Sequence, residues 1–225
     1  MSSLSKTSID QLGDRLRKGN VSEGDLRLLD TYRRSFSPSY EMVIDTIRTT
    51  VGLAPTGRPA KSTTSITEKL QRETIRLTQM QDIAGCRLVV ADIDAQNATV
   101  EALKRAFSSV DVVDRRRWPS HGYRAVHLIA NVQGKQIEIQ VRTTLQHLWA
   151  EFSEKLSDVI DPAIKYGGGP TDVSGLLKDY VEMVKAVEEA ESKPDRITAT
   201  AGWLTLKERL RRSLEKVISE WSELT

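Results

Sequence analysis

The chain has 225 residues, of which 28% are charged, and a formal net charge of +2. This length suits one substantial domain or a domain with a helical appendage, and the near-balanced charge argues against a protein coated in positive charge for duplex binding. No apolar run is long enough to span a bilayer, and the first residues lack a signal-peptide core, so we expect no membrane association and a cytoplasmic location. The single cysteine, Cys86, excludes an internal disulfide and is interpreted as a buried core thiol.

Residues 1–56 predict a helical segment. Apolar and charged residues recur at helical spacing before Pro38, and Ser39 is expected to cap the helix that follows it. The stretch from Gly52 to Ala60 contains Pro and Gly and predicts a loop. We therefore expect helices over residues 25–36 and 39–47. After the loop, we expect a third helix over residues 64–78.

Residues 57–166 predict a mixed α/β core. Strands are expected over residues 86–91, 110–114, 125–132 and 136–141, and helices over 97–107 and 144–158. The last two strands form a predicted hairpin, because Gln133-Gly134-Lys135 lies between them. The glycine run ending at Pro170 indicates a break and not a phosphate-binding P-loop, since no Lys-Ser/Thr pair follows it.

Residues 171–225 predict a second helical segment. Its last helix carries an apolar stripe from Trp203 to Trp221. Such a stripe packs on the protein's own core or forms an interface with a second copy or another partner. A homo-oligomer therefore stays open at this point.

A strand near residue 140 presents a polar face. Its aliphatic residues alternate with Glu138, Gln140 and Arg142, so an anion, an amide and a cation point the same way. This pattern suits a metal–phosphate site, although an ordinary solvated strand face gives it too.

Cations gather where the helix at residue 64 begins. Ser65, Lys69 and Arg72 fall on one helical face, and Lys61 precedes Ser65 by four residues. A helix start with cations around it is a good anion site; the alternative is a basic surface helix.

Three further features carry candidate chemistry. Asp82 precedes a buried strand and could hold Mg²⁺ or simply form a turn. Tyr123 follows the turn residue Gly122, where an exposed ring can stack on a nucleobase or pack at the end of a hairpin. The run of Arg115, Arg116 and Arg117 predicts a solvated loop or a contact with phosphate or RNA.

Taken together, these segments resemble the synthetase domain of the RelA/SpoT family, the alarmone (p)ppGpp synthetases. The resemblance runs from about residue 58 to 155, and the blocks at 82–87, 122–127 and 138–143 carry it best. It implies an α+β fold, a mixed β-sheet flanked by helices as in nucleotidyltransferases, with N- and C-terminal helices added. It also implies a pyrophosphokinase that transfers the β,γ-pyrophosphate of ATP to the 3′-hydroxyl of GDP or GTP. The His-Asp metal motif of the family's hydrolase domain is absent from the sequence.

The resemblance assigns roles residue by residue. Asp82 and Glu138 would hold Mg²⁺, and Glu138 could also take the proton from the attacking hydroxyl. The ATP phosphates and adenine would be bound by Arg58, Lys61, Ser65, Lys69, Arg72 and Arg87. Tyr123 would stack on the acceptor base, with His127, Gln140 and Arg142 beside it.

The chain departs from the family pattern on both sides. Arg58 lies one residue earlier than the usual adenine-side arginine. On the acceptor side, the usual lysines are replaced by Arg115, Arg116, Arg117 and Trp118, and His121 replaces an asparagine. One alternative is therefore a toxic relative that pyrophosphorylates the 3′ end of tRNA and is neutralised by an antitoxin. Another is a catalytically inactive module that binds nucleotide or RNA.

Overall fold

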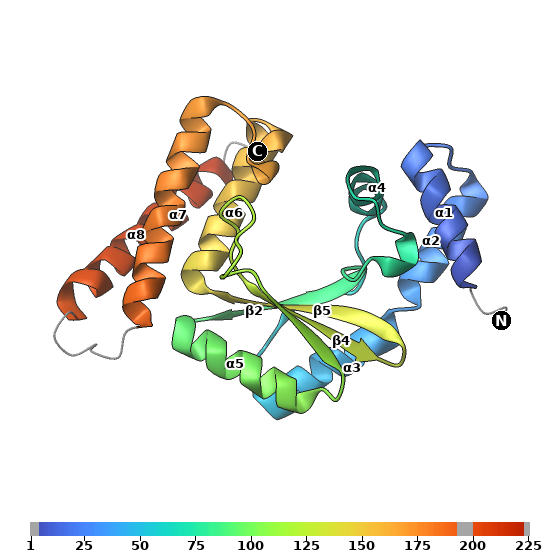
Figure 1. Cartoon of the computed structure of the whole chain (residues 1–225), viewed down its shortest axis with the longest axis horizontal. Helices are drawn as coiled ribbons and strands as arrows, with labels where there is room; N and C mark the ends of the chain where they lie inside the picture. Colours follow the sequence, from blue (N-terminus) through green and yellow to red (C-terminus); the bar gives the residue numbers. More distant parts are fainter. Residues whose placement is uncertain (1–4, 193–199, 223–225) are drawn as a thin grey trace. The chain divides into compact units, whose positions relative to one another are not determined.

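The computed structural model describes residues 5–192 and 200–222, and it has an α+β fold (Figure 1). Five strands form one mixed sheet in the order β1-β2-β5-β4-β3. The strands are β1 (Thr56–Arg58), β2 (Ala84–Val90), β3 (Val110–Asp114), β4 (Val126–Val132) and β5 (Lys135–Thr143). The α-helices are α1 (Lys6–Lys18), α2 (Glu23–Arg34), α3 (Ser37–Thr46), α4 (Thr63–Arg72), α5 (Ile93–Ala106), α6 (Thr144–Val159), α7 (Thr171–Glu191) and α8 (Thr200–Ser222). The predicted fold class is thus confirmed.

The chain divides into two compact units that do not follow the sequence order. The first unit contains residues 1–88, 103–112 and 128–140, and the second contains 89–102, 113–127 and 141–225. The division into segments 1–56, 57–166 and 171–225, inferred from the sequence, stays a proposal.

In the first unit, α1 packs against α2, α4 and a short 3-10 turn at Leu77–Gln79. Arg17 of α1 donates hydrogen bonds to the backbone oxygens of Leu70 and Ile75, at 2.7 and 2.5 Å. These bonds satisfy one carbonyl in the last turn of α4 and one beyond it; the helix ends at Arg72 and not at residue 78 as predicted. Helix α1 lies in the segment predicted to be helical, although no separate range was predicted for it, and it holds the chain that leaves α4.

Two other local predictions in this unit are wrong. Ser39 does not cap α3, because the helix begins at Ser37 with Pro38 in its first turn and buries Ser39. The predicted loop at residues 52–60 contains β1, which pairs antiparallel with β2. Gly57 leaves room for Tyr40 of α3, since a Cβ there would lie 1.8 Å from the tyrosine hydroxyl.

In the second unit, α6, α7 and α8 pack on one another, as the gold, orange and red ribbons of Figure 1 show. Their shared core contains Phe152, Val184 and Leu214, each at most 2% exposed. Leu210 and Leu214 lie in the apolar stripe of α8, so its middle packs on the protein's own core as predicted. The side chains of Trp203 and Trp221 lie outside the described residues.

The hairpin and the glycine-rich break are confirmed. Strands β4 and β5 meet through Gln133 and Gly134, both with positive φ, as a two-residue hairpin turn requires. A 3-10 turn at Pro162–Tyr166 precedes Gly167, and α7 begins directly after Pro170. Within the described ranges, no helix combines the length and apolar character that a membrane crossing requires.

Candidate functional site

Two lysines converge on one carboxylate in the first unit. The Nζ atoms of Lys61 and Lys69 lie 2.6 and 2.9 Å from different oxygens of Asp82. Their side chains are 12% and 21% exposed, and that of Asp82 is 15% exposed. Burial raises the pKa of Asp82, but the two ammonium groups lower it by more, so the net pKa lies below its usual value. The structure therefore brings together three residues that the sequence analysis assigned to phosphate and metal.

Local structure explains this convergence. Ser62, immediately before α4, accepts a hydrogen bond from the backbone of Ser65 and caps the helix. The backbone N–H of Lys61 donates to the oxygen of Ile83 at 2.7 Å, which extends the pairing of β1 past its end. Lys61 is therefore held beside the residue that follows Asp82, and the first turn of α4 lies next to it. Arg72, at the far end of the helix, is exposed and pairs with Glu73.

Glu138 lies on β5 next to the glycine of β2. A Cβ at Gly85 would come within 2.8 Å of the backbone oxygen of Glu138 and 3.3 Å of its Cβ. Gln140 donates a hydrogen bond of 2.8 Å to Glu138 Oε2. Burial, with a smaller effect of Glu138, raises the pKa of Cys86 to about 12, so this thiol stays neutral. The glycine thus lets the two strands approach closely where Glu138 projects.

The register of β1 and β2 places the two candidate adenine-binding arginines on one face. Arg58 lies opposite Gly85, and Arg87 lies opposite Thr56. Residues directly opposite share a face, as do residues two apart on a strand, so Arg58, Arg87 and Glu138 project from the same face. Arg58 and Arg87 are therefore diagonal neighbours across the two strands.

Tyr123 is held by two predicted partners in the second unit. Its hydroxyl accepts a hydrogen bond from Arg142 Nη2 at 2.9 Å and lies 2.9 Å from His127 Nε2. The guanidinium carbon of Arg142 also lies 4.9 Å from the centre of the tyrosine ring. Arg142 and His127 are both buried. Three assigned acceptor residues therefore form one cluster.

Two details of this cluster differ from the expectation. The ring of Tyr123 is partly buried against the α6–α7 core and is not a freely exposed platform. Arg142 is only 3% exposed, whereas the alternation of β5 predicted a polar, accessible face. Tyr123 packs against the core cluster of α6 and α7, and Arg142 lies against Tyr123, which is 19 positions away in the sequence. Gln140, the remaining acceptor candidate, lies in the first unit, where it donates a hydrogen bond to Glu138.

The arginine run before Tyr123 is divided by the structure. Arg116 forms two side-chain hydrogen bonds with Asp114 and further ones with Gln96 and Asn97. Arg115 and Arg117 are exposed, and Trp118 beside them is 82% exposed. The loop therefore presents two arginines and one aromatic ring to solvent, while Arg116 faces the protein.

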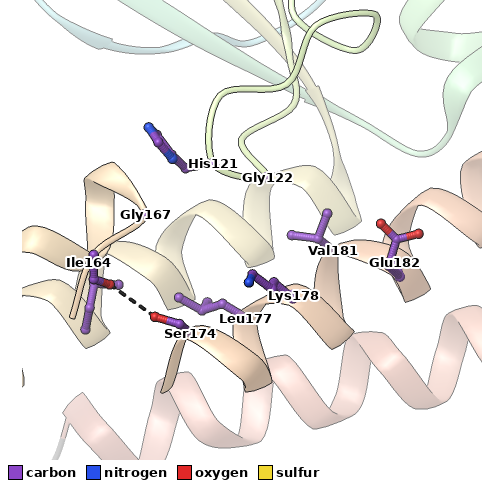
Figure 2. A pocket seen from close by; sticks show the side chains of 10 residues that line it. His121, Gly122, Ile164, Gly167, Ser174, Leu177, Lys178, Val181 and Glu182 are labelled. Atoms are coloured by element: carbon purple, nitrogen blue, oxygen red, sulfur yellow. Dashed lines mark hydrogen bonds between the residues drawn. The ribbon is translucent and has the colours of Figure 1, made fainter. Parts of the chain in front are cut away.

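Helix α7 also contributes to this region, which sequence reasoning missed. A cavity of about 290 Å³ lies between the loop and α7, and Figure 2 shows Lys178 and Val181 of the helix beneath His121 and Gly122. Glu188, farther along α7, is 3% exposed and pairs with Arg124. Burial raises the pKa of Glu188, against the opposing effects of Arg124 and Gln146. A carboxylate in a predicted apolar helix face is the one sequence signal that could have identified it.

The central segment of the chain matches a known family model. Residues 57–157 match the family model described as the region found in RelA/SpoT proteins. Uncharacterised proteins of Mycobacterium tuberculosis and Mycobacterium bovis are 36% identical over 144 residues, which is 59% of this chain and 51% of theirs. The chain thus spans about half the length of the curated relatives it matches.

Solved structures share the fold. A crystal structure of small alarmone synthetase 1 from Bacillus subtilis is 26% identical, with a TM-score of 0.53, and covers 76% of this chain and 95% of that one. The same enzyme bound to its product pppGpp gives a TM-score of 0.58 at 23% identity, over 74% of this chain and 95% of that one. A GTP pyrophosphokinase family protein from Streptococcus pneumoniae gives 0.54 at 21% identity, over 82% and 98%.

Proposed function

We propose that the chain is a RelA/SpoT-family synthetase and that it transfers the β,γ-pyrophosphate of ATP to the 3′-hydroxyl of GDP or GTP. The observation that supports this most strongly is the cluster of Lys61, Lys69 and Asp82. Two cations held beside a carboxylate, in the unit that also contains Glu138, suit a metal bound to a polyphosphate.

ATP is the proposed donor. When ATP binds, its phosphates would take Lys61 and Lys69 as partners, and Asp82 would then face the metal. Ser65 and Arg72 would contact the phosphates from α4, and Arg58 and Arg87 would enclose the adenine. Small alarmone synthetase 1 of Bacillus subtilis has been crystallised with AMPCPP, which supports an adenine nucleotide as ligand.

Mg²⁺ is the proposed cofactor. Asp82 and Glu138 supply carboxylate oxygens, and phosphate oxygens of ATP would complete the coordination that Mg²⁺ prefers. A divalent metal held by these residues would supply positive charge against the charge that develops during transfer. Glu138, held by Gln140, is also proposed to accept the proton of the attacking 3′-hydroxyl.

The acceptor is proposed to be a guanine nucleotide whose base contacts Tyr123. Arg142 and His127 fix the tyrosine, and these two residues supply further polar groups around it. The pppGpp product bound to the Bacillus subtilis enzyme supports this class of acceptor.

The nature of the second product tests the reaction type. Incubation with ATP, GDP and Mg²⁺ should release AMP in amounts equal to the pyrophosphorylated nucleotide, which chromatography of the mixture would quantify. ADP in place of AMP would identify an ordinary phosphoryl transfer and contradict the proposal.

A second candidate is the 3′ end of tRNA, which the exposed loop favours. Arg115 and Arg117 can contact phosphates, and Trp118 can stack on an unpaired base, an interaction worth about 1–3 kcal/mol. Such a toxic enzyme would need an antitoxin. That partner, the homo-oligomer, the cytoplasmic location and the inactive binding module all stay predictions.

Replacing Arg115 and Arg117 by alanine separates the two acceptors. We expect label transfer to tRNA to fall by about tenfold or more, and transfer to a guanine nucleotide by less than about threefold. Arg116 is kept, because its bonds to Asp114 and Gln96 are structural. Arg27→Ala/Arg34→Ala, with two arginine side chains 77% and 80% exposed in the first unit, is the matched control. Equal losses with both acceptors would remove the argument for RNA.

A further inference from the structure

One buried hydrogen-bond network holds both ends of the loop between β3 and β4. At its base, the backbone N–H of Arg115 donates to the oxygen of Ala125 at 2.9 Å. At the first end, Arg116 binds Asp114 and donates to Gln96 Oε1 at 3.1 Å. Gln96 lies on α5 and is fully buried. The start of the loop is therefore attached to a side chain inside the second unit.

At the other end, Arg124 is attached to α7. Its Nε and Nη2 atoms lie 2.7 and 2.6 Å from Glu188 Oε2, and the two side chains are 14% and 4% exposed. The other carboxylate oxygen of Glu188 accepts a hydrogen bond of 2.6 Å from Gln146 Nε2. Gln146 in turn accepts from Gln96 at 2.8 Å. Glu188 and the two glutamines thus connect Arg124 to Arg116.

The backbone of the loop also approaches α7 closely. Gly122 has φ +85°, and a Cβ there would lie 2.3 Å from Val181 Cγ2 and 2.9 Å from Trp149. Figure 2 shows Gly122 of the loop above Val181 of α7. Tyr123 lies between this contact and the Arg124–Glu188 pair, so α7 restrains the chain on both sides of the tyrosine.

We propose that Glu188 is a positioning residue that fixes the loop between β3 and β4, and with it Tyr123, to helix α7. The inference about the acceptor rests on the proposed function, whereas the restraint of the loop does not. A carboxamide at this position would lose the charge that pairs with Arg124 and would offer Gln146 and Arg124 a single oxygen. Because buried polar networks weaken as a whole when one member is lost, both ends of the loop would loosen.

The first experiment measures the loop without any substrate. Trypsin cleaves after arginine, and mass spectrometry of the early fragments would report cleavage after Arg115 and Arg117. Glu188→Gln should speed this cleavage by about tenfold. Glu191→Gln is the control: Glu191 is equally buried on the same helix, but it binds the backbone of Ile93 and Lys207 of α8. We expect trypsin to cleave that variant at the same rate as the natural chain.

A second variant keeps the test decisive if Glu188→Gln fails to fold. Arg124→Gln breaks the same pair from the loop side, and its folding is checked by circular dichroism. It should show the same faster cleavage after Arg115 and Arg117. Cleavage at the natural rate in the folded variants, or equal acceleration in Glu191→Gln, would overturn the proposal.

The kinetic readout tests the positioning role. Glu188→Gln should raise the KM for the acceptor by about tenfold while the KM for ATP stays within about twofold. Equal changes in both constants would indicate a general structural role and contradict positioning. A natural chain that transfers nothing would refute the proposed function, and the proteolysis result would still decide the restraint of the loop.

Discussion

Replacing Glu138 by glutamine should lower pyrophosphate transfer by about 1,000-fold or more while leaving the fold intact. Glutamine has nearly the same shape, and the side chain is only partly buried on β5, so the strand loses no packing. It loses the negative charge that would hold Mg²⁺ and accept the proton of the attacking hydroxyl. Initial rates of AMP release, with circular dichroism of the variant, provide the measurement.

Glu68→Gln, an exposed glutamate of α4 in the same unit, is the matched control and should retain the natural rate. If Glu138→Gln turned over ATP and acceptor at a rate near that of the natural chain, the assignment of Glu138 to metal and proton transfer would be wrong. Loss of both activity and helical signal would instead attribute the effect to folding.

Replacing Asp82 by asparagine should impair both catalysis and stability. Transfer should fall by about 100-fold or more, because one of two proposed metal ligands is lost. Stability should fall by about 2 kcal/mol at neutral pH, because Lys61 and Lys69 would remain close together without their anion. Urea denaturation of the natural and variant chains measures this difference.

The stability difference should depend on pH in one direction. The pKa of Asp82 lies below its usual value in the folded protein, so the unfolded state binds more protons as the pH falls. The contribution of Asp82 is therefore complete above the pKa of the unfolded chain, near pH 4, and is lost as the pH falls through the lower folded value. Natural and variant chains should become more nearly equal in stability at about pH 3.

Asp14→Asn provides the control for this effect. Asp14 pairs with Arg17 but its side chain is 65% exposed, so its removal should cost less than about 1 kcal/mol. Equal stability of Asp82→Asn and the natural chain at neutral pH would show that the lysine–carboxylate cluster does not form without ATP.

Local pattern predicted the strands well but not their surroundings. The alternation around Ile137 and Ile139 places Glu138 and Gln140 on one face, because the side-chain period of a strand is set by its backbone. The same reasoning failed for Arg142, which is buried and lies against Tyr123, 19 positions away in the sequence. Periodicity carries no information about what covers a face.

The candidate site shows the same division. Residue types near the start of α4 indicated an anion site, but the pairing of Lys61 and Lys69 with Asp82 depends on contacts across 13 to 21 positions. Arg116 resembles its neighbours in sequence, and only the structure distinguishes it, through Asp114 and Gln96. Strand β1 was missed because its three residues include a glycine that local propensity assigns to a loop.

The most direct test is transfer of label from ATP carrying radioactive γ-phosphate, in the presence of Mg²⁺, to GDP, GTP and tRNA offered in parallel. The proposed function predicts label on GDP or GTP, with that transfer abolished in Glu138→Gln. Label on tRNA alone would contradict a guanine nucleotide acceptor and favour the loop of Arg115, Arg117 and Trp118 as the acceptor-binding element. No label on any acceptor would contradict the assignment of this chain as a pyrophosphokinase.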